Sequence, residues 1–296
     1  MTHGLRDRVR PSIRRRRRLH YFLRNLFFAP AERREAILAR RASAPCTLPI
    51  VMIVGCSRSG TSFAARMLKS AGLLLPGEHT PPDEFNPEGY FEEDRVVAVN
   101  SDILWGSGGH WFMPPPRLRV YAYQRAQIVQ ALTWFCSFGG IAGWKDPRGT
   151  LTLPVWLEMA RELEIPVCVV GVFRNPAAVA ASIVRHERGA IEFPQALSAW
   201  CVHNARLLDL AASQPSRFSW FTTDQCEQRV EKNLNALAGR LGLGGRVAMD
   251  DNHRRTIVPN LLEIPAMVRE IHERLLAAHA AQWGPTNRHA HNSAAS

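Results

Sequence analysis

The sequence has no closely spaced pair of cysteines and no long uninterrupted apolar run. Scattered cysteines indicate neither a zinc site nor a disulfide framework, so we expect reduced thiols and a cytoplasmic protein. A membrane-spanning helix needs about 20 apolar residues, and the apolar run at residues 19–28 is too short and too interrupted. We find no internal repeat and no carboxylate cluster for a metal ion. The six cysteines are Cys46, Cys56, Cys136, Cys168, Cys201 and Cys226.

A basic segment at the start of the sequence carries almost all of the net charge of +11. Residues 1–41 hold thirteen arginines and three acids, a balance of +10, which leaves +1 for residues 42–296. Because the rest of the chain is nearly neutral, we expect no nucleic-acid partner. The run Arg14 to Arg18 and the aromatic residues behind it have two interpretations. They form either a solvated arm or a peripheral contact with an anionic membrane.

Strands alternate with helices over most of the sequence, which favours an α/β fold whose parallel sheet carries helices on both faces. We expect an arm and linker over residues 1–47, one domain over residues 48–281 and a disordered tail over residues 282–296. The expected strands are 48–54, 72–75, 141–145, 166–173 and 218–222. The expected helices are 61–71, 92–104, 152–163, 177–186, 194–212, 224–241 and 264–281.

The first strand is followed by the loop Gly55-Cys56-Ser57-Arg58-Ser59-Gly60-Thr61-Ser62 and then by a helix. Small residues let backbone N–H groups converge on an anion, and the helix N-terminus adds a positive dipole. The spacing matches a Walker A loop except at the seventh position, where Thr61 replaces the lysine. Arg58 supplies a cation from inside the loop instead. The missing lysine disfavours a kinase or ATPase, which needs that charge on the β and γ phosphates.

The loop resembles the 5′-phosphosulfate loop of sulfotransferases that use 3′-phosphoadenosine-5′-phosphosulfate (PAPS). The resemblance implies a P-loop NTPase-like three-layer fold, a central parallel sheet flanked by helices, with PAPS as co-substrate and no metal. A second match concerns the 3′-phosphate: Arg174 ends the clearest strand, and Ser182 lies eight residues later on the next helix. Two helical turns separate them, so both can face one phosphate. In the loop, the resemblance assigns PAPS contacts to Ser57, Arg58, Ser59, Gly60, Thr61 and Ser62.

Weaker matches extend the resemblance over about residues 48–260. Gly143-Trp144-Lys145-Asp146-Pro147-Arg148 resembles a segment of the tyrosylprotein and bacterial branches, which implies that Lys145 lies beside the transferring sulfate. Residues 86–92 resemble another bacterial segment. Residues 249–255 resemble the basic C-terminal segment, which implies nucleotide contacts from Arg254 and Arg255. The sequence departs from the family at residues 222–224, Thr-Thr-Asp in place of Tyr-Glu-Asp, which weakens the case for an adenine contact there.

Together the motifs predict transfer of a sulfuryl group from PAPS to a hydroxyl or amine of an acceptor such as a carbohydrate, lipid or small metabolite. We expect Arg58 and Lys145 to stabilise charge on the leaving phosphate. Glu92 and Glu78 are equal candidates for the general base. Two alternatives stay open: a P-loop kinase or ATPase with a variant loop, and a non-enzymatic membrane or nucleic-acid adaptor that acts through the arm.

Overall fold

A computed structural model describes residue 37 and residues 45–79, 81–84, 86–247 and 264–284. Its centre is a sheet of four parallel strands in the order β2-β1-β3-β4. The predicted α/β fold with a central parallel sheet is therefore confirmed. Parallel strands that are covered on both faces consist of nearly continuous apolar residues. The strands are β1 (Ile50–Gly55), β2 (Gly143–Lys145), β3 (Val167–Phe173) and β4 (Phe218–Thr222).

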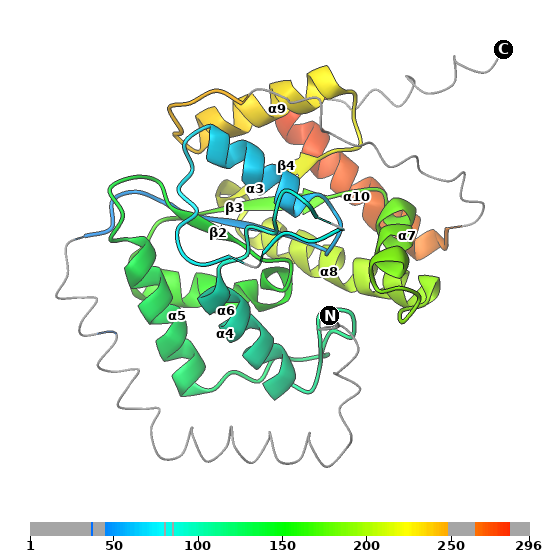
Figure 1. The fold of residues 1–296 in the computed structure, drawn as a ribbon, viewed down its shortest axis with the longest axis horizontal. Helices are drawn as coiled ribbons and strands as arrows, with labels where there is room; N and C mark the ends of the chain where they lie inside the picture. Colours follow the sequence, from blue (N-terminus) through cyan, green and yellow to red (C-terminus); the bar gives the residue numbers. More distant parts are fainter. Residues whose placement is uncertain (1–36, 38–44, 80, 85, 248–263, 285–296) are drawn as a thin grey trace.

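Helices cover both faces of the sheet and give the molecule three layers (Figure 1). On one face lie α3 (Thr61–Ser70) and α9 (Glu227–Arg240), which share a core cluster with the sheet. The other face contributes to a second, larger core cluster. Its helices are α4 (Asp94–Gly106), α5 (Ala122–Phe135), α6 (Gly149–Glu162), α7 (Pro176–His186), α8 (Phe193–Ser213) and α10 (Ala266–Trp283).

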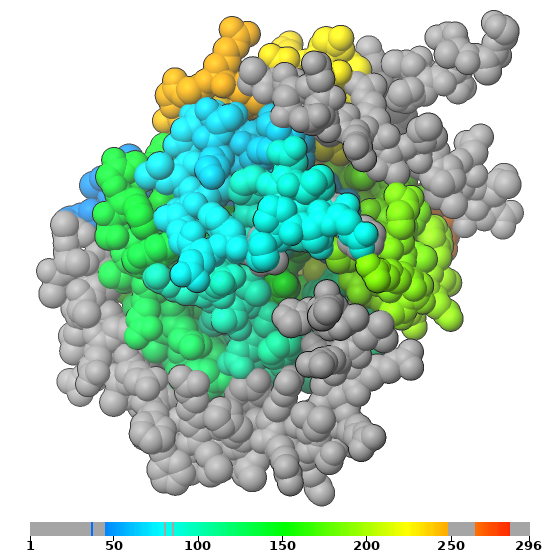
Figure 2. Space-filling model, in the orientation of Figure 1, coloured from blue at the N-terminus to red at the C-terminus, as the bar shows by residue number. Residues whose placement is uncertain are grey.

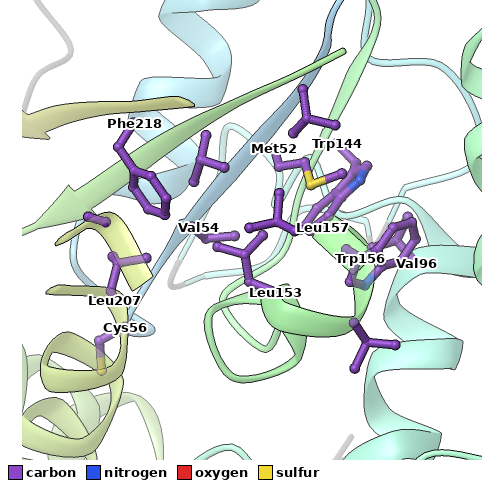
Figure 3. Packing of buried hydrophobic residues seen from close by; sticks show 14 of the residues in the cluster. Met52, Val54, Cys56, Val96, Trp144, Leu153, Trp156, Leu157, Leu207 and Phe218 are labelled. Atoms are coloured by element: carbon purple, nitrogen blue, oxygen red, sulfur yellow. The ribbon is translucent and has the colours of Figure 1, made fainter. Parts of the chain in front are cut away.

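Alternation along β1 distributes its side chains between the two cores. Val51 and Ile53 face α3 and α9, whereas Met52 and Val54 face the opposite layer. Figure 3 shows Met52 and Val54 among leucines and tryptophans of β2 and α6. The rings of Trp144 and Trp156 lie 4.9 Å apart between their centroids. Burial of such side chains stabilises the fold by about 1.5–3 kcal/mol each, which fixes the carboxyl ends of the strands where the site is built.

Two predicted elements differ clearly from the structure, and one helix of the structure was not predicted. The expected strand at 72–75 is a single parallel bridge between Leu74 and Ala142, because only one residue there reaches the edge of β2. Helix α6 begins at Gly149 rather than 152, with Pro154 tolerated inside it at the loss of one backbone hydrogen bond. Helix α5 was not expected, although it is largely buried.

The first residues of the expected tail, 282–296, belong to a helix. Gln282 and Trp283 belong to α10, where both hydrogen-bond with the backbone of Trp220 in β4. The distances are 2.8 Å from Trp220 N to Gln282 Oε1 and 2.7 Å from Trp283 Nε1 to Trp220 O. The expectations for residues 1–36 and for Arg254 and Arg255 lie outside the described residues. No helix among the described residues is long and apolar enough to cross a membrane.

The expectation that no disulfide forms was wrong. Cys46, in the linker before β1, is bonded to Cys136 at the end of α5, with 5.4 Å between their Cα atoms. That separation lies within the normal range for a disulfide. The fold brings together residues that are 90 positions apart, so no short spacing reveals the pair. Because disulfides are rare in the cytosol, cysteine usage no longer supports a cytoplasmic location. The other four cysteines are free, and Cys56 is buried as expected.

Candidate active site

The strand order creates a place for a ligand between β1 and β3. The chain leaves β1 toward β2 on one side, and it leaves β3 toward β4 on the other. In an open parallel sheet, ligands bind outside the carboxyl ends of two neighbouring strands whose connections diverge in this way. The predicted phosphate loop follows β1, and Arg174 follows β3. Two segments selected by sequence therefore meet at the carboxyl ends of β1 and β3, the place that we call the crevice.

The backbone of the phosphate loop is held in unusual conformations. Gly60, the residue before α3, has a φ of 93°, and Arg58 has a φ of 67°. A positive φ is uncommon for a residue other than glycine, and such strain gathers at functional sites. At the start of the loop, a Cβ on Gly55 would lie only 2.1 Å from the carbonyl oxygen of Val172. Glycine is therefore required where the loop leaves the sheet.

The loop presents polar groups that lack partners within the described part of the chain. The hydroxyl of Ser59 is fully buried and makes no hydrogen bond there. The N–H groups of Thr61 and Ser62 begin α3, where helical geometry leaves donors without internal acceptors, and no acceptor for them is found among the described residues. A phosphate would satisfy all three groups, so these residues fit the 5′ end of the expected co-substrate.

One predicted loop contact is occupied by the protein itself. The N–H of Ser59 donates to the carbonyl of Cys56 over 3.1 Å, which closes a tight turn. This N–H is therefore not directed at an anion, and Ser59 presents its hydroxyl instead. Ser57 is half-buried beside it. The N–H donors of the loop that have no acceptor among the described residues thus lie toward its end, at the start of α3.

The two predicted phosphate sites touch each other. Arg58 Nε of the loop donates to Ser182 Oγ on α7 over 3.1 Å. Burial lowers the pKa of Arg58, Tyr90 and Asp83 act in the opposite direction, and the charges of Arg174 and Arg185 lower the pKa further. The guanidinium groups of Arg174 and Arg185 therefore each lie close enough to repel that of Arg58. Such a cluster is stabilised by a ligand that carries several negative charges.

Arg174 has an acidic neighbour that the sequence analysis did not identify as part of the site. Its Nε lies 3.7 Å from Oδ1 of Asp224, just beyond the end of β4. The N–H of Asn175 donates to Oδ2 of the same carboxylate. Burial raises the pKa of Asp224 to about 6, although Arg174 acts in the opposite direction. Asn175 caps α7 through its own side chain, which fixes the position of Arg174 relative to the helix.

Lys145 reaches the phosphate loop from β2. Its buried ammonium donates to Ser62 Oγ at 3.1 Å, to the carbonyl of Tyr90 at 3.0 Å and to Glu92 Oε1 at 2.7 Å. Burial lowers the pKa of Lys145, and Glu92 opposes that effect. The structure therefore brings the predicted Lys145 to the last residue of the predicted loop.

Glu92 is a poor match for a general base. It also accepts a hydrogen bond from Arg148 Nη1 at 2.9 Å. Burial disfavours its ionised form, but Lys145 and Arg148 outweigh burial and lower its pKa. A base requires a pKa near the working pH, so Glu92 is better suited to hold the two cations. Glu78, the other candidate, is exposed, and its carboxylate makes no ion pair with the described residues.

A network of polar side chains holds the charged groups of Lys145, Glu92 and Arg148 in place. Arg148 Nη1 donates to Asp146 Oδ1 at 2.6 Å, and Asn100 Nδ2 donates to Asp146 Oδ2 at 2.9 Å. Burial raises the pKa of Asp146, whereas Arg148 lowers it. The hydroxyl of Thr150 accepts from the N–H of Gly55 at 2.8 Å. The network connects α4, β2 and α6 to the loop, so the charges cannot move independently of the fold.

The segment between α3 and α4 lies across the phosphate loop, and it is the cyan region on the front face in Figure 2. Asn86 Nδ2 donates to Ser62 Oγ at 3.2 Å. The hydroxyl of Tyr90 donates to Asp83 Oδ2 at 2.7 Å and lies 3.3 Å from His186 Nε2 on α7. These contacts connect the segment to both α3 and α7, which places Tyr90 beside Lys145 at the edge of the crevice.

Comparisons with models of protein families and with curated proteins give no match. Three solved structures share a fold-level likeness. The sulfotransferase domain of the Synechococcus PCC 7002 olefin synthase is 16% identical, with 79% of this chain and 94% of that domain covered and a TM-score of 0.43. The sulfotransferase domain of the curacin biosynthetic pathway is 14% identical, with coverage of 77% and 97% and a TM-score of 0.46. Sulfotransferase STF1 of Mycobacterium tuberculosis H37Rv is 14% identical, with coverage of 87% and 84% and a TM-score of 0.38.

Proposed function

We propose that this chain is a sulfotransferase that passes the sulfuryl group of PAPS to a hydroxyl or amine of an acceptor. One observation carries the proposal: Arg58 of the phosphate loop donates to Ser182 of α7. The residues selected for the 5′-phosphosulfate and those selected for the 3′-phosphate therefore belong to one cationic crevice. A nucleotide with phosphates at both positions matches that charge distribution.

The free polar groups suggest which residue holds which phosphate. Ser59 Oγ and the N–H groups of Thr61 and Ser62 suit the 5′-phosphate, since they have no acceptor among the described residues. Arg174 and Ser182 suit the 3′-phosphate. Arg58 lies between the two groups and can serve either phosphate. PAPS, when bound, supplies the sulfuryl group.

Lys145 and Arg58 would stabilise the charge that develops during transfer. As the bond between sulfur and the leaving phosphate oxygen breaks, negative charge grows on the phosphate. Cations that are already fixed in a buried site stabilise such charge without reorganising. Lys145 is held in this way by Ser62 and Glu92. We therefore assign Glu92 to the positioning of Lys145, whereas Glu78 stays a prediction for the base.

One observation favours nucleoside triphosphate chemistry as a second candidate. Lys145 reaches Ser62 from another strand, so a cation is present near the place that the Walker A lysine serves. The same contact also argues against it. In P-loop NTPases the serine at this position binds Mg²⁺, and an ammonium 3.1 Å from Ser62 Oγ repels a divalent cation. The balance favours sulfuryl transfer.

Calorimetry with the desulfated product, 3′-phosphoadenosine-5′-phosphate (PAP), tests the proposal. We expect the full chain to bind PAP about ten- to a hundredfold more tightly than AMP, because hydrogen bonds to charged groups contribute about 1.5–3 kcal/mol. Arg174→Ala and Ser182→Ala should remove most of this difference. Arg161→Ala, on the exposed side of α6, is the matched control and should leave it unchanged. Equal binding of PAP and AMP, or tighter binding of ATP with Mg²⁺, would contradict the proposal.

A further inference from the structure

The carboxylate of Asp224 is fixed in place at the predicted 3′-phosphate site. Oδ2 of Asp224 accepts from the N–H of Asn175, and the backbone N–H of Asp224 donates to Thr222 Oγ1 at 3.2 Å. The side chains of Asp224 and Arg174 are only 21% and 16% exposed. Because β3 and β4 are paired up to Phe173 and Thr222, the residues that follow these strands meet at the same edge. The acid is therefore part of the crevice and not a solvated surface group.

The same segment also borders the phosphate loop. A Cβ on Gly60 would lie 3.2 Å from Cγ2 of Thr223, so Thr223, the residue before Asp224, packs against the end of the loop. Asp224 thus faces the crevice that Arg58 and Arg174 line. Its carboxylate is surrounded by Arg174, which follows β3, by the N–H of Asn175 at the start of α7 and by the hydroxyl of Thr222 in β4. Arg174 and Arg185 both lie near the guanidinium of Arg58, whose charged and polar neighbours also include Asp83 and Tyr90.

The pairing between Arg174 and Asp224 is loose. At 3.7 Å the two atoms are too far apart for a hydrogen bond, and the buried Nε of Arg174 has no other hydrogen-bond partner in the described chain. A phosphate and a carboxylate are alternative partners for one guanidinium, and both prefer a paired geometry with it. Asp224 therefore offsets the charge of Arg174 but does not provide a hydrogen-bond acceptor for its Nε.

We infer that Asp224 determines how selectively the site takes a 3′-phosphate, because its carboxylate competes with that phosphate for Arg174. The inference rests on the proposed function, since it presupposes a nucleotide phosphate at Arg174. Two anions beside one guanidinium repel each other when both are ionised. Binding of the 3′-phosphate therefore requires Asp224 to take up a proton or to leave Arg174. A ligand without the 3′-phosphate does not meet this competition.

The competition has a defined pH dependence. Burial already raises the pKa of Asp224 to about 6, and a phosphate bound beside it raises the pKa further. Above that pH the free protein has an ionised Asp224, so phosphate binding takes up a proton and weakens as the pH rises. When binding takes up one proton, the affinity for the phosphate falls by at most about tenfold per pH unit. The phosphate itself titrates near pH 6, at about the same value, so the effect must be measured as a ratio between two proteins with the same ligand.

Calorimetric titration of the full chain with PAP and with AMP tests this inference. Asp224→Asn removes the charge and keeps an oxygen that accepts from the N–H of Asn175. We expect Asp224→Asn to bind PAP about tenfold more tightly than the wild type at about pH 8, and within about twofold at about pH 5.5. AMP binding should not change. Asp224→Glu, which keeps a carboxylate, should retain the pH dependence, and Asp209→Asn, at an exposed position of α8, is the matched control.

The possible outcomes separate the inference from the proposed function. Tighter binding of PAP by Asp224→Asn that grows with pH supports competition. Equal affinities of the two proteins at every pH overturn the inference and leave the proposed function intact. Weaker binding by Asp224→Asn also overturns it, since Asp224 would then orient Arg174 for the phosphate. If neither protein binds PAP more tightly than AMP, the proposed function fails and the inference fails with it.

Discussion

Lys145 depends on Glu92 to remain charged inside the protein. Burial lowers the pKa of this lysine, and the ion pair of 2.7 Å with Glu92 opposes the shift. In Glu92→Gln the opposing charge is lost while Arg148 remains nearby, so the pKa of Lys145 falls further. We expect activity that declines toward higher pH, as Lys145 loses its proton at a lower pH than in the wild type. The measurement is the rate of sulfuryl transfer from PAPS against pH.

The same variant should also be less stable. Removal of one partner of a buried ion pair typically costs about 3–5 kcal/mol, which thermal or denaturant unfolding will detect. The matched control is Asp209→Asn, because Asp209 pairs with Arg274 at 3.9 Å on the surface, where such pairs contribute about 0–1 kcal/mol. If Glu92 were the general base, activity would be lost at every pH without recovery toward acid. That result would contradict the role assigned here.

Individual residues of the candidate site could be selected where a motif places them, but their partners could not. Arg58, Lys145, Arg174 and Ser182 are selected by local spacing after strands, which a linear pattern contains. Asp224 is separated from Arg174 by 50 positions, and only the pairing of β3 with β4 brings their ends together. The low pKa of Glu92 likewise depends on cations from β2 and from the start of α6. Which charges pair with one another therefore depends on the folded arrangement of the strands and could not be predicted from the sequence.

At the scale of secondary structure, the N-terminus of α3 depends on a glycine. Gly60 has a φ of 93°, and a Cβ there would lie 3.2 Å from Thr223. We expect Gly60→Ala to destabilise the protein by about 1–2 kcal/mol, because a side chain is disfavoured in the left-handed region, and to weaken PAP binding by displacing the first N–H groups of the helix. Chemical denaturation and calorimetry measure the two effects.

A second glycine provides the opposite case. Gly239 lies within α9, and a Cβ there meets no atom within 4 Å. Gly239→Ala should stabilise the protein by about 0.5–1 kcal/mol, as alanine is the better helix former, with no change in PAP binding. A Gly60→Ala protein that behaves like Gly239→Ala would show that the loop does not need its left-handed residue.

Elements were predictable in proportion to the clarity of their pattern. Residues 166–173 and 218–222 are short apolar runs that flank helices, and both form strands close to the expected positions. Helix α5 was missed because it packs against both α4 and α6. Its buried residues therefore extend around the helix and do not form one apolar stripe. A helix that is buried on one side is therefore easier to predict from its sequence pattern than a helix that is buried on two sides.

At the scale of the whole molecule, the order of the strands could not be predicted from local sequence patterns. The sequence indicated alternating strands and helices, but the order β2-β1-β3-β4 determines which loops meet. This order places the chain reversal between β1 and β3, so the phosphate loop and Arg174 share one crevice. The disulfide between Cys46 and Cys136 is a second long-range feature, and it connects the linker to the layer that contains α5.

The disulfide leads to a prediction for the stability of the whole chain. It closes a loop between residues 90 positions apart, and loop closure of that length restricts the unfolded chain, with a typical stabilisation of about 2–4 kcal/mol. Cys46→Ser, Cys136→Ser and the double variant should each lower the melting temperature by the same amount, because each removes the same bond. Cys226→Ser, which changes an exposed free thiol, is the control. Titration of thiols in the denatured, unreduced protein should find four, and a count of six would show that the bond does not form in solution.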